Sequence, residues 1–352
     1  MTGYKIKFHG VDRLYKDYSW RLSNRAKSVW ESGNVLQGKY LDQLEKQVAK
    51  KYKRKYAIGV GSATDGLYFA MKAIGLTKNS TVLCPVFSYI ATAGAIRRIG
   101  ADIRFVDTDE NGNIGDWGVM GLPNAILYVN MFGNPADYTR IRKYCDDHKI
   151  PLIEDAAQSQ GAVHGRTPSG ALGDVSVFSF DPMKNMPSFG GGGMVLTDSK
   201  DVYDIVMSLR RHALNGKTAY GYNSLISEDH ANQLLLLLSK FDKLQKMRQK
   251  VFDRYKKNLS HTNFIETRSN TQSSHHKLVM LCDNRNELKT YLAQNGIETK
   301  IHYVKTLDNK NVGKYPNAEI MCAKSLSLPI YPHLKMKEID YICDKIRKFN
   351  GV

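Results

Sequence analysis

A lysine and an acidic pair are the side chains of this sequence best suited to chemistry. Glu154 and Asp155 end a short apolar stretch, where a carboxylate could accept a hydrogen bond from a protonated ring nitrogen. Lys184 follows the next apolar stretch. Burial beside such residues lowers the pKa of a lysine and leaves a nucleophilic amine that can form a Schiff base. Each residue also has an ordinary interpretation, because aspartate often caps a helix and most lysines lie at the surface.

Two glycine-containing segments could bind an anion or turn the chain. Residues 61–66 (GSATDG) separate a predicted strand from a predicted helix, so their backbone amides and the helix dipole could hold a phosphate. Thr64 as a plain helix N-cap explains this segment equally well. The segment matches neither a Walker loop nor the G-x-G-x-x-G pattern, so it indicates neither a nucleoside triphosphate nor NAD. The run Gly190–Gly193 is, by itself, typical of a hairpin connection.

Short strands alternate with helices up to about Leu214, and this order must position the four segments. Each segment follows a predicted strand, and open parallel sheets bind ligands at the carboxyl ends of their strands. The alternation is typical of βαβ units and a mostly parallel sheet. The predicted strands are residues 56–60, 81–84, 103–106, 125–129, 151–154, 175–180 and 194–197, and the predicted helices are residues 40–52, 67–74, 91–99 and 138–148.

The pattern changes beyond Leu214, which suggests a second domain. Glu228–Leu259 predicts one long helix or two, a mixed segment follows, and residues 337–348 predict a final helix. A chain of 352 residues is long enough for two domains. We therefore expect a large α/β domain over residues 1–240 and a smaller α+β domain over residues 241–352, divided near Leu236–Gln245.

The composition is that of an ordinary globular protein, with 42% hydrophobic and 24% charged residues. It excludes a disordered chain, a collagen-like fibre and a small disulfide scaffold. The longest aliphatic run, Leu234–Leu238, is too short to cross a membrane, so we expect no membrane partner. Residues 1–10 show no secretory signal, and five cysteines without a C-x-x-C pair predict reduced thiols, no metal site and a cytoplasmic protein.

The net charge of +17 could attract anionic small molecules such as nucleotide diphosphates. The basic residues are spread along the chain, and the densest block, residues 50–55, ends a predicted helix, so a solvated surface explains most of them. No DNA-binding motif accompanies the charge, and we expect no nucleic acid as a partner. A basic nucleic-acid-binding module is an alternative that the charge alone supports.

Taken together, the segments resemble the nucleotide-sugar aminotransferases of the DegT/StrS family. These are fold-type I enzymes that use pyridoxal 5'-phosphate (PLP). The resemblance implies an aspartate aminotransferase-like fold, PLP as the cofactor and a homodimer with shared active sites. It is carried by residues 59–67, 85–92 (PVFSYIAT), 153–161 (IEDAAQSQG), 173–185 and 191–198, and it extends to residues 33–38, His212, residues 221–223 and residues 326–332.

The resemblance also implies roles for single residues. Lys184 is similar to the catalytic lysine that binds the PLP aldehyde and moves the proton, and Asp155 to the partner of the ring nitrogen. The remaining cofactor-binding positions are Gln158 and Tyr89 on the two faces of the ring, the amides of Ala63 and Thr64 with the Ser179 hydroxyl at the phosphate, and Asn223 at the phosphate of the neighbouring subunit's cofactor.

The implied reaction moves the amino group of L-glutamate to the keto group of a sugar linked to a nucleotide diphosphate. Within the family, a lysine at position 184 favours this reaction, whereas a histidine there marks dehydratases. We predict the C-4 keto group of a UDP- or dTDP-linked 4-keto-6-deoxyglucose as acceptor, giving the viosamine nucleotide. The alternative is amination at C-3, because the place of Asp65 resembles that in some C-3 enzymes. A PLP-binding regulator without turnover is a further alternative.

Overall fold

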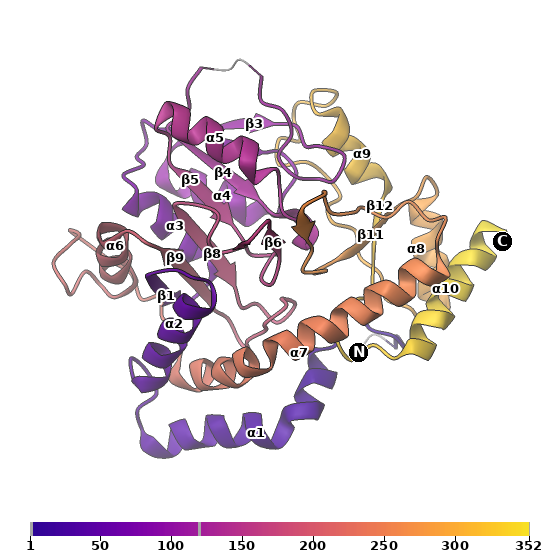
Figure 1. Ribbon diagram of the computed structural model, residues 1–352, viewed down its shortest axis with the longest axis horizontal. Coiled ribbons are helices and arrows are strands. Elements are labelled where there is room, and N and C mark those ends of the chain that lie inside the picture. Colours follow the sequence, from indigo (N-terminus) through magenta and orange to yellow (C-terminus); the bar gives the residue numbers. More distant parts are fainter. Residues whose placement is uncertain (1–2, 119–120, 352) are drawn as a thin grey trace.

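A seven-stranded sheet forms the centre of the structure, a computed structural model that describes residues 3–118 and 121–351 (Figure 1). Its strands are β1 (Tyr56–Val60), β2 (Thr81–Pro85), β3 (Asp102–Val106), β4 (Ala125–Val129), β5 (Leu152–Asp155), β8 (Val175–Ser179) and β9 (Gly193–Thr197). They lie in the order β1-β9-β8-β5-β4-β2-β3, and every neighbouring pair is parallel except those that β9 forms. The predicted mixed, mostly parallel α/β sheet is confirmed.

Helices cover both faces of this sheet. One face is packed by α3 (Ala63–Ala73), α4 (Ile90–Ile99) and α6 (Lys200–Arg210), and the other by α2 (Lys39–Lys51), α5 (Tyr138–His148) and α7 (Glu228–Asn258). The alternation of side chains along each strand supplies apolar residues to both faces. In β1, for example, Ile58 and Val60 face α3, whereas Ala57 faces α2.

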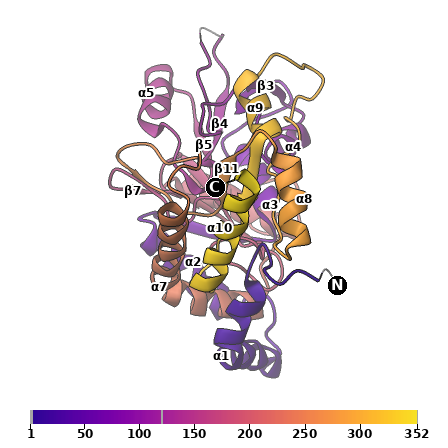
Figure 2. The same cartoon turned by 90° about the vertical axis from the view of Figure 1, so that its right-hand side faces the viewer.

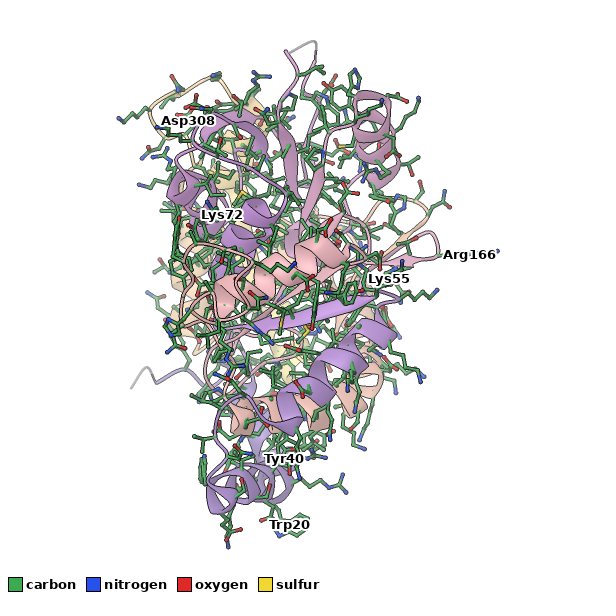
Figure 3. All side chains as sticks on the ribbon, turned by 90° about the vertical axis from the view of Figure 1, so that its left-hand side faces the viewer. Trp20, Tyr40, Lys55, Lys72, Arg166 and Asp308 are labelled. Atoms are coloured by element: carbon green, nitrogen blue, oxygen red, sulfur yellow. The ribbon has the colours of Figure 1, made fainter. Side chains whose placement is uncertain are left out.

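Helix α1 (Val11–Ser32), which was not predicted, packs along α7 at the outside of the fold. The helix has the spacing of an amphipathic helix, but charged and polar residues fill the gaps between its apolar positions. Trp20 lies on its other face, is 75% exposed and projects from α1 in Figure 3. The buried side chains of α1 are Leu14, Tyr18, Leu22, Ala26 and Val29.

The helix α7 is continuous over 31 residues and joins two hydrophobic cores. Its first half packs against α1 and α2, and its second half packs against α10 (Met336–Asn350), which lies between α7 and α8 (Arg285–Gln294) in Figure 2. The predicted domain boundary, Leu236–Gln245, falls inside this helix. The division of the chain into residues 1–240 and 241–352 stays a prediction.

Smaller elements complete the fold. Two antiparallel strands, β11 (Leu278–Leu281) and β12 (Ser325–Leu328), pack with α8 and α10 around the second core. The others are β6 (Val163–His164), β7 (Thr167–Pro168), β10 (Thr271–Gln272) and α9 (Pro316–Lys324).

Basic side chains are dispersed over the surface, as the sequence suggested. Lys72 on α3 and Arg166 in the turn between β6 and β7 lie on well-separated parts of the face in Figure 3. Within residues 3–118 and 121–351, no helix has the length and apolar character needed to cross a bilayer. The same residues contain no group of three or more histidine, cysteine or acidic side chains placed to hold a metal ion.

Glu154 of β5 is fully buried, and its carboxylate is the acceptor of a dense hydrogen-bond network. Because side chains alternate along a strand, Glu154 points away from the face toward which Asp155 points. The donors are the amides of Gly170 and Leu172, the side-chain amide of Asn130 and the hydroxyls of Ser169 and Ser176, at 2.6–3.1 Å.

We predict that Glu154→Ala lowers the free energy of unfolding by roughly 3 kcal/mol or more, because it leaves several buried donors without an acceptor. Urea denaturation followed by circular dichroism measures this loss. Glu287→Ala, at an exposed position near the start of α8, is the matched control and should change the free energy by less than about 0.5 kcal/mol. A loss below about 1 kcal/mol for Glu154→Ala would contradict the structural role given to the network.

Candidate active site

A cavity of about 330 Å³ opens where β5 and β8 end, at Asp155 and Ser179. The carboxyl ends of parallel strands are the expected place for a ligand in such a sheet. The cavity brings together the following predicted site residues: Ala63, Thr64, Tyr89, Asp155, Gln158, Ser179 and Lys184. It does not include Asn223.

Asp155 is a buried carboxylate held by two hydrogen bonds. Its Oδ2 accepts from the Thr92 hydroxyl at 2.9 Å, and its Oδ1 accepts from the Ala157 amide at 3.1 Å. Burial raises the pKa of Asp155, whereas the two hydrogen bonds and the charge of Lys184 act in the opposite direction. A carboxylate with so little solvent around it interacts strongly with a cationic group that enters the cavity.

Lys184 lies in a tight turn just beyond β8. Its amide donates to the Asp181 carbonyl at 2.9 Å, and the Asp181 carboxylate accepts from the Met183 amide at 3.0 Å. Burial lowers the pKa of Lys184, although the charges of Asp155 and Asp181 oppose this shift. The neutral amine is the nucleophilic form, and the structure thus places a reactive lysine in the cavity rather than in an exposed turn.

The N-terminus of α3 faces the same cavity. Its N-cap is Ser62, whose Oγ accepts from the Asp65 amide at 3.1 Å. The alternative in which Thr64 caps the helix is therefore wrong, because Thr64 lies within the first turn. This leaves the amides of the first turn and the helix dipole available to a phosphate.

Gly193 lets β9 pass directly against this helix end. A Cβ at Gly193 would lie 2.5 Å from the Ala63 nitrogen, closer than any real side chain could be. The glycine run does connect the antiparallel strands β8 and β9, as a hairpin connection would. It also brings Gly191 and Gly192 to the cavity wall.

Gln158 and Tyr89 differ in how firmly they are held. The Gln158 side chain donates to the Tyr303 hydroxyl at 3.1 Å and accepts from the Phe132 amide at 3.1 Å. Tyr89, by contrast, is 59% exposed, and its ring centre lies 6.2 Å from that of Tyr303. The Gln158 side chain is therefore held by two hydrogen bonds, whereas the Tyr89 ring is open to solvent.

Four further residues that were not predicted as site residues also line the cavity: His276, Lys277, His302 and Tyr303. Burial lowers the pKa of His302 to about 2 and that of His276 well below its usual value, so both imidazoles are neutral. Burial also lowers the pKa of Lys277 to about 7. The sequence does show two polar residues, His276 and Lys277, directly before an apolar strand. Nothing in their spacing, however, indicates that they lie near Lys184 in the fold.

Asn223 lies outside the cavity of its own chain. It is exposed, and its backbone pairs with that of Arg211. Its predicted contact with the cofactor of a neighbouring subunit stays a prediction.

A lysine, a buried carboxylate and a helix N-terminus meet around one cavity, an arrangement that fits PLP and a transamination. The chain belongs to the DegT/DnrJ/EryC1/StrS aminotransferase family, whose characteristic sequence matches residues 19–347. This confirms the family and the fold that the sequence predicted.

Two curated relatives and one crystal structure illustrate the similarity. The chain is 30% identical to the pleiotropic regulatory protein of Geobacillus stearothermophilus, over 91% of this chain and 92% of that protein. It is 28% identical to the dTDP-3-amino-3,4,6-trideoxy-alpha-D-glucose transaminase of Streptomyces venezuelae, over 98% and 96% of the two chains. The crystal structure of S. venezuelae DesV in complex with a ketimine intermediate superposes with a TM-score of 0.95, at 27% identity over 99% of each chain.

The protein is accordingly a PLP-dependent nucleotide-sugar aminotransferase, and its own residues fit the cofactor. Asp155 would offer an anion to the protonated ring nitrogen, Lys184 an amine to the aldehyde, and the start of α3 a set of amides to the phosphate. When bound, PLP supplies an electron sink for the carbon that carries the amino group.

We predict that Asp155→Asn slows transamination by about a hundredfold or more, because the amide cannot keep the ring nitrogen of PLP protonated. Single-turnover absorbance of the holoenzyme with an amino donor measures the rate. A rate within threefold of wild type would contradict the role given to this carboxylate.

Thr92→Val is the matched milder change, because it removes one hydrogen bond to Asp155 and keeps the charge. The lost hydrogen bond lowers the pKa of Asp155 in the wild type. The variant pKa should therefore be higher, and the rate should begin to fall at a higher pH on acidification. An unchanged acid limb would show that Asp155 does not control it.

Proposed function

We propose that the protein transfers the amino group of L-glutamate to the keto carbon of a nucleotide-linked 6-deoxyhexose. The observation that carries this proposal is that Lys184 and Asp155 line one cavity at the carboxyl ends of β5 and β8. Family membership supports the reaction class, and the cavity supports the assignment of the two residues to it.

In this reaction Lys184 Nζ removes and returns the proton at the carbon that bears the amine. Asp155 holds the ring nitrogen cationic, and Gln158 supports one face of the ring from a position fixed by two hydrogen bonds. The neutral His276 and His302 add no positive charge next to Lys184. This leaves the amine of Lys184 free to act as a base.

Two positions on the sugar have comparable support as the site of amination. The sequence favours C-4 of a UDP- or dTDP-linked 4-keto-6-deoxyglucose and hence a viosamine nucleotide. The name of the S. venezuelae transaminase places the amino group at C-3 and supports the alternative. Asp65, which suggested C-3, pairs with Arg98 at 2.7 Å and accepts from Ser224 at 2.8 Å outside the cavity, so it does not choose between them.

A regulator without turnover is a second candidate, because the relative from G. stearothermophilus is named as a regulatory protein. Lys184 and Asp155 argue against it. A protein that only binds PLP needs neither a pKa-lowered lysine nor a carboxylate aimed at the ring.

We also propose a cytoplasmic homodimer with shared active sites. All five cysteines are free thiols, which favours a reducing compartment. The exposed position of Asn223 and the open Tyr89 side of the cavity are what a second subunit would cover.

The wild-type protein loaded with PLP should be yellow and should lose this absorbance when L-glutamate is added. Lys184→Ala should not interconvert the two cofactor forms, whereas the surface change Lys72→Ala should behave as wild type. Product NMR with 3-keto and 4-keto substrates then identifies the carbon that is aminated. A wild-type protein that remains colourless with PLP would overturn the proposed function.

Subunit mixing tests the shared site. Lys184→Ala and Asn223→Ala dimers should each be impaired, but a mixed dimer has one site in which both residues are intact. Unfolding and refolding the two variants together should therefore restore activity above that of either alone. Without any such recovery, Asn223 does not act on the neighbouring subunit.

A further inference from the structure

Lys277 is a second lysine in the wall of the active-site cavity, and the reaction described above does not use it. It directly precedes β11, and its amide donates to the Phe132 carbonyl at 3.0 Å, which fixes its backbone. Its ammonium lies 4.9 Å from the centre of the Phe8 ring. A cation over an aromatic face is partly stabilised, but the ring does not neutralise its charge.

Arg248 and Lys300 bring positive charge close to Lys277, whereas the imidazoles of His276 and His302 nearby are neutral. Lys184 and Asp181 face it from the turn after β8, Arg248 from α7, Lys300 and His302 from the segment before α9, and His276 from the preceding position. Of these groups, Asp181 is the single anion.

Two cations near Lys277, Arg248 and Lys300, already have partners. Arg248 donates to the carbonyls of Ile330 at 2.7 Å and His275 at 3.3 Å, and Lys300 pairs with Glu298 at 3.3 Å. Lys277, in contrast, has no carboxylate within ion-pair distance among residues 3–118 and 121–351. Because Lys184 is assigned to the aldehyde of the cofactor, Lys277 is the lysine of this wall that can accept an anionic group from a substrate.

We propose that Lys277 binds a carboxylate of the substrate, carried either by the amino donor or by C-6 of an acidic keto sugar. This inference rests on the proposed function, since it concerns the substrates of the same cavity. A carboxylate beside a lysine in a site with little water forms a strong, charge-assisted hydrogen bond. Lys277 then determines substrate specificity, whereas Lys184 carries out the proton transfer.

Binding of glutarate, a dicarboxylate that cannot react, tests the contact without turnover. Calorimetry on the PLP-loaded protein should show binding that is about tenfold weaker in Lys277→Gln than in wild type. Lys277→Arg should retain the affinity. Lys300→Gln is the matched control, because this lysine also lies near Phe8 but is paired with Glu298, and it should change the affinity by less than twofold.

The pH dependence gives a second readout that a merely structural role would not produce. Since the pKa of Lys277 is about 7, the wild type should bind glutarate more tightly at pH 6 than at pH 8, where the ammonium is lost. Lys277→Arg stays charged and should not show this fall. Retained PLP absorbance in each variant confirms that the cavity has folded.

The two half-reactions identify which substrate carries the carboxylate. A raised KM for L-glutamate with little change in kcat assigns it to the amino donor. A loss confined to a 6-carboxylate keto sugar nucleotide, with its 6-deoxy counterpart unaffected, assigns it to the sugar and replaces the proposed 6-deoxy acceptor.

Equal losses with both sugars would assign Lys277 to the diphosphate and overturn the proposal. Unchanged glutarate binding together with unchanged half-reactions in Lys277→Gln would also overturn it. Failure of the wild type to react with L-glutamate is a separate result, which rejects the donor of the proposed function.

Discussion

The carboxylate of Glu154 is the constraint on which the active site depends. It is sealed in the core, and the hydrogen bonds that it accepts tie β5 to the loop over residues 169–172 and to β8. With Glu154 fixed on one side of the strand, the neighbouring Asp155 has to face the cavity. The two adjacent acids therefore have different roles. Glu154 stabilises the structure around the end of β5, and Asp155 faces the cavity.

Asp155 and Lys184 form the second layer of this organisation. Each would be costly to bury alone as a charged group, and each shifts the pKa of the other toward its charged form. Their opposite signs offset part of the cost of burying both groups beside the cavity. A cofactor with a cationic ring nitrogen and an aldehyde can contact both groups at once. The pairing of opposite charges that stabilises the two buried groups therefore also suits the binding of this cofactor.

Much of this site was legible in the sequence, since its residues come at the ends of predicted strands. Asp155, Ser179 and Lys184 follow buried strands, and parallel pairing brings such ends to one edge. The place of Lys277 and His302 in the site could not be predicted from the sequence. They come from a distant part of the chain, and local periodicity does not indicate such long-range contacts. The same reason explains α1, whose apolar stripe becomes meaningful only beside α7. The contact of Asn223 remains a prediction because it concerns a second chain.

The unbroken course of α7 has a mechanical consequence. A helix of 31 residues spans about 46 Å and bends only gently unless a proline or a bulge interrupts it. Its two halves pack into different hydrophobic cores, so the helix couples the stability of one core to that of the other. If one core unfolds, the other loses apolar contacts with α7. We therefore expect both cores to unfold in one cooperative thermal transition.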